Sequence, residues 1–182
     1  MRRLLVVFLV VAVFAGGASA ATVDPKAVVL SPTDVPAGYM LDRNDSMVLS
    51  RALIARSPDA AARKLLRSGF VSAYFARYTN VGGPHWTYVT SGAYVFREEA
   101  GARRMLALTL VEARGGLAIA QRLQLGDDAW VVSIGGREPT TAVLWRYRGI
   151  MALVTCSEMT RHRTLALRLA RKQQRRIAGE VG

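Results

Sequence analysis

The chain has 182 residues, of which 51% are hydrophobic and 21% are charged, and this composition excludes a disordered or collagen-like protein. Its length suits one domain of ordinary size, which can bury a core without metals or disulfides. The formal net charge is +12. The chain has one cysteine, so it cannot form an internal disulfide. With one cysteine and two histidines it also cannot build a zinc site of four cysteines, or of two cysteines and two histidines.

The first 20 residues have the three-part layout of a secretory signal peptide. Arg2 and Arg3 form a positive n-region, residues 4–14 are uninterrupted apolar residues, and residues 18–20 (Ala-Ser-Ala) match an A-x-A cleavage site. The apolar stretch is too short to span a bilayer, which takes about 20 residues. We therefore expect cleavage after Ala20, export from the cytoplasm and no transmembrane span in the mature protein.

Residues 21–45 are predicted to be irregular, because two prolines interrupt a turn-rich stretch near the start of the mature chain. Pro32 and Pro36 both resist helix and central strand. Residues 46–54 have mixed character and give no clear prediction. We expect a single folded domain over residues 46–182.

Three helices are predicted, each with a recognisable start or end. They are expected at residues 58–67, 97–114 and 161–178. Ser57 is the expected N-cap of the first helix, with Pro58 at its first position, and Gly69 follows its end. Gly179 is expected to end the last helix.

Five strands are predicted from alternating or continuous apolar residues between turn signals. They are expected at residues 70–78, 85–96, 129–134, 140–148 and 150–156. The second strand is expected to be broken or bulged near Ser91-Gly92, and residues 117–125 fit either a short helix or an edge strand. Strands that follow one another directly favour antiparallel hairpins. The sequence therefore predicts an α+β fold, with a mainly antiparallel sheet of about five strands and helices packed on it.

No recognisable catalytic set accompanies this fold, since the sequence has no G-x-S-x-G, P-loop or dinucleotide motif. Only His85 and His162 could serve as an imidazole base. Asp127-Asp128 form a close carboxylate pair, but adjacent carboxylates usually diverge, so a solvated turn is favoured over a glycosidase site. Cys156 lies in an apolar run, which favours a buried free thiol and leaves an intermolecular disulfide open. We predict no catalytic residue, metal ligand or cofactor.

The last predicted helix has the strongest charge pattern in the chain. At 100° per residue its apolar residues gather on one arc and its cationic residues on the opposite arc. The residues expected to form a surface for an anionic partner, the first two of them from the predicted strand at residues 140–148, are Arg146, Arg148, Arg161, Arg168, Arg171, Lys172, Arg175 and Arg176. Phospholipid headgroups and an anionic wall polymer suit such a surface, and nucleic acid is the least favoured partner of an exported protein. The structural alternative is a helix docked on the sheet with its polar face in solvent.

Aromatic residues on the predicted strands are the second candidate site. They are Trp86, Tyr88, Trp130, Trp145 and Tyr147. Aromatic residues on strands belong to the core more often than to a ligand platform. If the sheet leaves a cleft beside a helix, however, these side chains are expected to line an apolar pocket.

Three short stretches are similar to segments of known bacterial proteins. They are residues 34–39 (Asp-Val-Pro-Ala-Gly-Tyr), 126–129 (Gly-Asp-Asp-Ala) and 145–150 (Trp-Arg-Tyr-Arg-Gly-Ile). Together they resemble poorly characterised bacterial secreted proteins and lipoproteins, and also the extracellular sensor domain of PknH-type receptor kinases. The resemblance implies an antiparallel sheet flanked by helices, with a cleft proposed to bind an unknown ligand. The chain departs from that pattern because it lacks the paired cysteines, and no catalytic residue carries over.

The sequence favours a secreted, non-enzymatic domain that binds a ligand or a component of the cell envelope. One alternative is a peripheral envelope protein, which its last helix holds electrostatically on anionic lipid or wall polymer and which high salt releases. Another is a hydrolase with an unrecognised site, which requires His85 or the Asp127-Asp128 pair to lie in a concave pocket. The identity of the ligand and the oligomeric state stay open.

Overall fold

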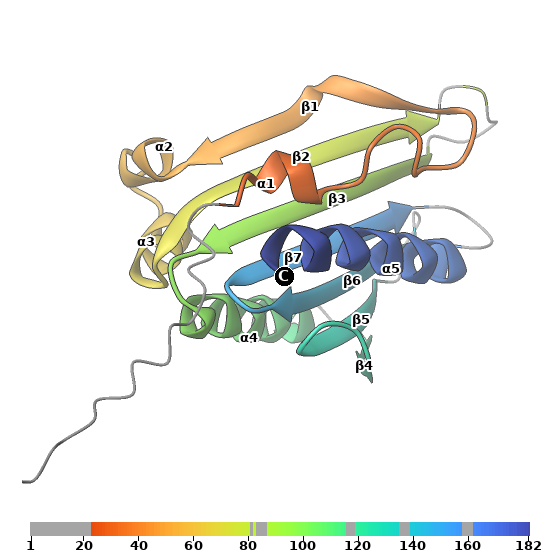
Figure 1. The fold of residues 1–182 in the computed structure, drawn as a ribbon. Helices are drawn as coiled ribbons and strands as arrows, with labels where there is room; N and C mark the ends of the chain where they lie inside the picture. The colour runs from red at the N-terminus through yellow and green to blue at the C-terminus, as the bar shows by residue number, and fades with distance from the viewer. Residues whose placement is uncertain (1–22, 81, 83–86, 116–118, 135–138, 158–161) are drawn as a thin grey trace, which may run out of the picture.

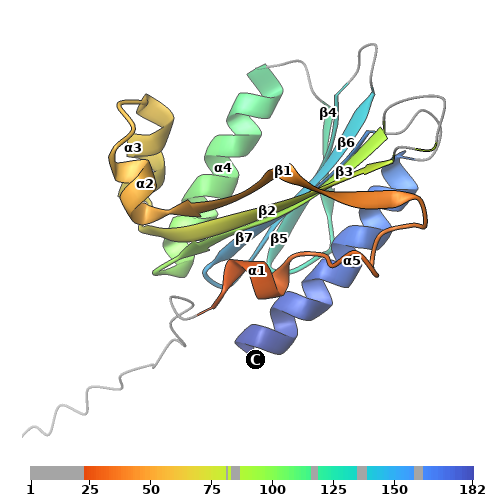
Figure 2. The ribbon, with the colours of Figure 1, turned by 90° about the horizontal axis from the view of Figure 1, so that it is seen from above.

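The fold is an antiparallel sheet with helices on both faces (Figures 1 and 2). A computed structural model describes residues 23–80, 82, 87–115, 119–134, 139–157 and 162–182. The predicted signal peptide over residues 1–20 lies outside these ranges, as do His85, Trp86 and Arg161.

The described residues form seven strands in the order β1-β2-β3-β7-β6-β5-β4, and every neighbouring pair is antiparallel. The strands are β1 Tyr39–Ser50, β2 Phe70–Asn80, β3 Thr87–Phe96, β4 Ile119–Leu123, β5 Asp128–Ile134, β6 Thr140–Tyr147 and β7 Ile150–Ser157. Two meanders, β1 to β3 and β4 to β7, meet where β3 pairs with β7. The antiparallel α+β prediction is confirmed, but the number of strands exceeds the predicted five.

The two additional strands lie at the edges of the sheet. β4 matches the edge-strand alternative for residues 117–125. β1 begins inside residues 21–45, so the prediction that these residues are irregular is wrong from Tyr39 onward, and it is also wrong at residues 25–28, which form a short helix. The Asp42 carboxylate accepts hydrogen bonds from the backbone N–H groups of Asn44 and Asp45 at 3.0 and 3.2 Å. The register shifts between Asp42 and Met47 at this polar turn, which hides the two-residue period of the strand.

The helices of the described residues are α1 Pro25–Val28, α2 Arg51–Ala55, α3 Ala60–Arg67, α4 Glu99–Gly115 and α5 His162–Val181. Three of these five helices, α3 to α5, follow the predicted helices with shifted ends, whereas α1 and α2 were not predicted. The predicted cap of α3 is two residues early, because the side chain of Asp59 accepts the N–H of Ala61, while the Ser57 hydroxyl accepts the N–H of Asp59. Gly69 follows α3 with a φ of +79°, as a helix-ending glycine should. Gly179 does not end α5, which continues to Val181.

The predicted break at Ser91-Gly92 is absent, since β3 pairs without a register shift there on both sides. Gly92 has a packing role instead. A Cβ atom at this position would lie 2.7 Å from the ring of Phe75 and 3.2 Å from Leu153. The glycine therefore gives neighbouring side chains room on the sheet surface.

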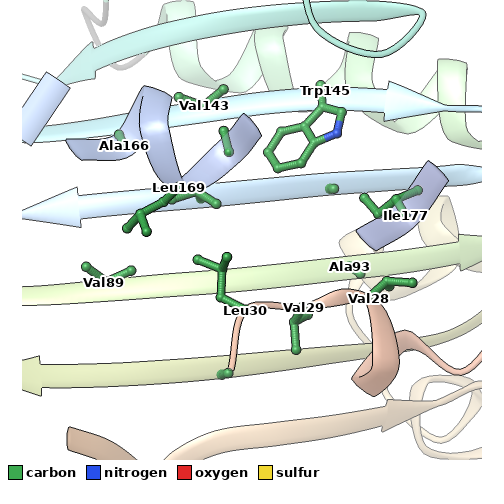
Figure 3. Close-up of a cluster of buried hydrophobic side chains, with 14 of the residues drawn as sticks. Val28, Val29, Leu30, Val89, Ala93, Val143, Trp145, Ala166, Leu169 and Ile177 are labelled. Atoms are coloured by element: carbon green, nitrogen blue, oxygen red, sulfur yellow. The ribbon is translucent and has the colours of Figure 1, made fainter. Parts of the chain in front are cut away.

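Each face of the sheet has its own core. α1 and α5 cover one face, and α3 and α4 lie on the other (Figures 1 and 2). Under α5, the buried side chains of Leu169 and Ile177 lie near Trp145 of β6 (Figure 3). Under α4, Leu106 and Leu110 belong to a second cluster that also includes strand residues. The sheet is thus the middle layer of three.

Residues 23–38, here called the N-terminal segment, are part of the α5-side core. The side chains of Val28, Val29 and Leu30 are buried (Figure 3), and so is that of Val35. The hydroxyl of Tyr78 donates to the Leu30 carbonyl at 2.6 Å, and the N–H of Leu30 donates to Ser91 Oγ at 2.9 Å. This segment, which the sequence places outside the folded domain, is fixed on β2 and β3 beside α5.

Candidate functional site

The outward face of α5 carries a row of arginines. Leu165, Leu169 and Ile177 point into the core, so the helix is anchored by its apolar side. The exposed residues of the opposite side include Arg168, Arg171 and Arg175. Their spacing of three and four residues places them along one stripe, about 10 Å long at 1.5 Å per residue. We call these three residues the α5 arginine row.

The α5 arginine row has no carboxylate partner among the described residues. By contrast, Arg163 on a flank of the helix donates to Gln121 Oε1 at 2.7 Å. Because the row is exposed and unpaired, its positive potential is directed to solvent.

Two other predicted surface cations bind the N-terminal segment. Lys172 Nζ donates to the carbonyl of Asp34 at 3.1 Å. Arg176 donates to Ser31 Oγ at 3.1 Å and forms an ion pair with the Asp34 carboxylate at 2.8 Å. These two cations hold the segment against α5, so they contribute less to an open binding surface than the row does.

Asp34 is held ionised by this arrangement. Partial burial opposes its charge, but hydrogen bonds from the backbone and hydroxyl of Ser31, with the charges of Arg176 and Lys172, outweigh burial. Together they keep the pKa of Asp34 below its ordinary value. The carboxylate therefore neutralises part of the positive charge on this flank of α5.

The two strand arginines predicted to extend the surface are used elsewhere. Arg146 pairs with Asp127 at 2.9 Å, and its side chain is only 13% exposed. Arg148 donates to the carbonyl of Val181 at the end of α5. A cation is favoured at a helix C-terminus, so Arg148 stabilises the helix end rather than extending the row.

A hollow of about 370 Å³ lies beside the first turns of α5. Its described lining comprises Pro36, Ala37, Tyr39, Asn80, Thr164, Leu165 and Arg168. Arg168 thus connects the arginine row to a concave surface. The sequence pattern does not predict this hollow, because its walls come from the N-terminal segment, two strands and a helix. The sequence feature that could have indicated this hollow is the turn at residues 34–39, which carries part of the PknH-type resemblance.

The four predicted aromatic residues that the structure describes lie on opposite faces of the sheet and do not line a common pocket. Trp145 is fully buried under α5, where its Nε1 donates to Gln174 Oε1 at 2.7 Å, and Tyr147 packs against the same cluster. Trp130 packs against the cluster on the opposite face. Tyr88 also points to that face, because its neighbour on the strand faces α5, and the Arg77 guanidinium lies 4.3 Å from its ring centroid.

The Asp127-Asp128 pair lines a concave surface of about 730 Å³ formed by residues 122–128, which is the position that the hydrolase alternative requires. Both carboxylates, however, have cationic partners. Asp127 accepts hydrogen bonds from the Arg146 side chain at 2.9 Å and from the N–H of Arg148 at 2.7 Å. Asp128 lies 3.6 Å from Arg122. Cys156 is buried and forms no disulfide bond. In the part of the chain that the structure describes, no group of three or more histidine, cysteine or acidic residues could hold a metal ion.

A solved structure with a similar fold is the extracellular domain of PknH from Mycobacterium tuberculosis. The two align with a TM-score of 0.55 at 10% sequence identity, over 82% of this chain and 94% of that chain. No protein-family model matches the chain, and no curated protein matches it in sequence. The similarity agrees with the PknH-type resemblance at the level of the fold. Over the described ranges, no helix has the length and apolar character needed to cross a bilayer.

Proposed function

We propose that this chain is a non-enzymatic domain that acts outside the cytoplasm and binds a phosphate-bearing anionic component of the cell envelope through the α5 arginine row. The unpaired, exposed state of Arg168, Arg171 and Arg175 is the observation that carries the proposal. Arginine suits phosphate because its planar guanidinium can donate two parallel hydrogen bonds. The expected signal peptide and the similarity to an extracellular domain support a place outside the cytoplasm.

Attachment would be electrostatic rather than by insertion into a bilayer. The apolar side of α5 is occupied by the sheet, since Leu169 and Ile177 are fully buried. Only the cationic side faces outward. Loss of the predicted signal peptide removes Arg2 and Arg3 and leaves a net charge of +10, from 23 basic and 13 acidic residues. This excess charge would attract an anionic surface over about one Debye length, roughly 10 Å at 0.1 M salt.

Vesicle binding tests the proposal. The mature protein is expected to bind vesicles that contain phosphatidylglycerol and not to bind vesicles of phosphatidylcholine alone. It should dissociate from the anionic vesicles as the salt concentration rises. Replacing Arg168, Arg171 and Arg175 with glutamine should weaken binding about 100-fold, since each arginine near an anionic surface contributes about 1 kcal/mol. Co-sedimentation across a salt series measures both effects.

The matched control is the triple replacement of Arg43, Arg56 and Arg103 with glutamine, because these arginines are exposed on other elements. It removes the same charge and should reduce affinity far less. Equal losses in the two triple variants would contradict a binding site on α5, and salt-independent binding would contradict electrostatic attachment. A hydrolytic turnover that depends on Asp127 would overturn the non-enzymatic proposal.

A further inference from the structure

A second hollow lies between the N-terminal segment and the first two strands. Its volume is about 240 Å³. The sheet supplies Leu41 of β1 with Tyr74 and Ala76 of β2, and the segment supplies apolar side chains opposite them, including Val29 and Pro32. The hollow is therefore walled mainly by hydrocarbon and aromatic groups on two sides.

Two phenols, those of Tyr74 and Tyr78, line this hollow, and Tyr78 is the buried one. Tyr78 is 1% exposed, and its hydroxyl donates to the Leu30 carbonyl at 2.6 Å. Burial, with a smaller contribution from Tyr74 and Asp34, raises the pKa of Tyr78 to about 12. The wall therefore stays neutral at physiological pH and is suited to an apolar group.

The rim of the hollow is cationic. Lys26 of α1 lies there, with its Nζ 6.0 Å from the centroid of the Tyr74 ring. Arg176 also lines the hollow, but its guanidinium is paired with Asp34 at 2.8 Å. No acidic residue is among the described lining residues. Lys26 is thus the exposed cation without a carboxylate partner in this part of the described chain.

We propose that this hollow binds a small amphipathic anion, whose alkyl chain lies against Leu41, Tyr74 and Ala76 and whose anionic head contacts Lys26. The charge at the rim and the apolar walls match the two ends of such a molecule. A volume of about 240 Å³ is that of roughly eight water molecules at ~30 Å³ each, which is room for a short alkyl chain of on the order of eight carbons. This site is separate from the α5 arginine row and does not depend on it.

Calorimetric titration of the mature protein with hexanoate, heptanoate, octanoate and decanoate tests the site. Affinity should rise about fourfold with each added methylene, the equivalent of ~0.8 kcal/mol, until the chain reaches about eight carbons, and then level off. Octanol should bind several-fold more weakly than octanoate, because it lacks the charge that Lys26 attracts. Affinity that does not depend on chain length would overturn the proposal.

Two variants that fill the hollow provide the structural test. Ala76→Leu places a larger side chain on its floor, and Leu41→Trp enlarges a half-buried residue at the sheet edge. Either folded variant should lose octanoate binding at least tenfold. Ala76 is only 2% exposed, so a leucine there can prevent folding. In that case the Leu41→Trp variant decides the result. Full octanoate affinity in both folded variants would refute the site.

The role of Lys26 is tested by comparing its replacement with the same replacement of a control lysine, Lys64. Lys26→Gln should abolish the preference for octanoate over octanol, whereas Lys64→Gln, on the other face of the sheet, should keep it. The triple glutamine variant of the α5 arginine row should bind octanoate as the unmodified protein does, and Leu41→Trp should still bind anionic vesicles. Octanoate binding that is lost with the arginine row instead would contradict this separate site.

Discussion

Gln173 is a buried amide that joins a helix to the centre of the sheet. Its Oε1 accepts from the Ser91 hydroxyl at 2.9 Å, and its Nε2 donates to the Gly92 carbonyl at 3.0 Å. Ser91 in turn accepts the N–H of Leu30. One side chain of α5 therefore fixes β3 and, through Ser91, the N-terminal segment.

Removing this amide should destabilise the protein. Gln173→Leu keeps similar bulk but leaves the Ser91 hydroxyl and the Gly92 carbonyl without their side-chain partner, so we expect a loss of about 1–3 kcal/mol in the free energy of unfolding. Urea unfolding measures the change. Gln124→Leu, at an exposed position, is the control and should alter stability by less than about 0.5 kcal/mol. Equal stability of Gln173→Leu and the unmodified protein would refute a structural role for this network.

At the scale of elements, α5 shows which features a helical sequence pattern predicts and which it does not. The 3.6-residue period correctly places Leu165 and Leu169 inward and Arg168 outward. The same period assigns Lys172 and Arg176 to the cationic surface, but both bind a segment more than 130 residues earlier in the chain. Such long-range partners arise only when the chain folds, so periodicity alone could not identify them.

The strands show a similar division. Strands with continuous apolar residues between turns, such as β6 and β7, were predicted closely. β1 was missed because its polar turn near Asp42 breaks the alternation, and Gly92 suggested a bulge although it serves packing against Phe75. Local signals describe local geometry, whereas edge strands and close approaches depend on neighbours that the sequence pattern does not specify.

Gly179 is expected to lower the stability of α5 relative to an alanine at the same position. The glycine lies inside the helix, and no atom lies within 4 Å of the position that an added Cβ would occupy. Gly179→Ala should therefore raise the free energy of unfolding by about 0.5–1 kcal/mol, because alanine favours a helix more than glycine does. Thermal unfolding measures the change. Gly92→Ala should have the opposite sign, since its Cβ would meet the Phe75 ring at 2.7 Å. A lower melting temperature for Gly179→Ala would contradict the continuous helix.

At the scale of the whole molecule, the N-terminal segment closes one side of the three-layer fold. It buries Val28 and Leu30 beside α5, and it lines both hollows on this face. The sequence excludes it from the folded domain because prolines and turn residues dominate its pattern. Its place is set by tertiary hydrogen bonds and by the Asp34–Arg176 ion pair, none of which has a local signature. The geometry of the proposed sites therefore depends on how firmly this segment is held.

Asp34 should make that attachment sensitive to acid. Its pKa is below the ordinary value in the folded protein, so its contribution to stability is complete above the unfolded pKa of about 3.9 and is lost as the pH falls through the folded pKa. Asp34→Asn should be less stable than the unmodified protein at pH 7, and the difference should shrink as the pH falls below about 4. Urea unfolding between pH 7 and pH 3 measures it.

Asp45→Asn is the control for this pH dependence. The Asp45 side chain is 54% exposed and pairs with Arg77 at 3.4 Å, so its loss should cost little, as is usual for surface ion pairs. A stability difference for Asp34→Asn that stays constant from pH 7 to pH 3 would show that the carboxylate charge does not hold the segment. If the difference shrinks as expected, binding of the uncharged probe octanol should weaken over the same pH range in the unmodified protein, because the ion pair that helps to hold the wall of the second hollow against α5 is then lost.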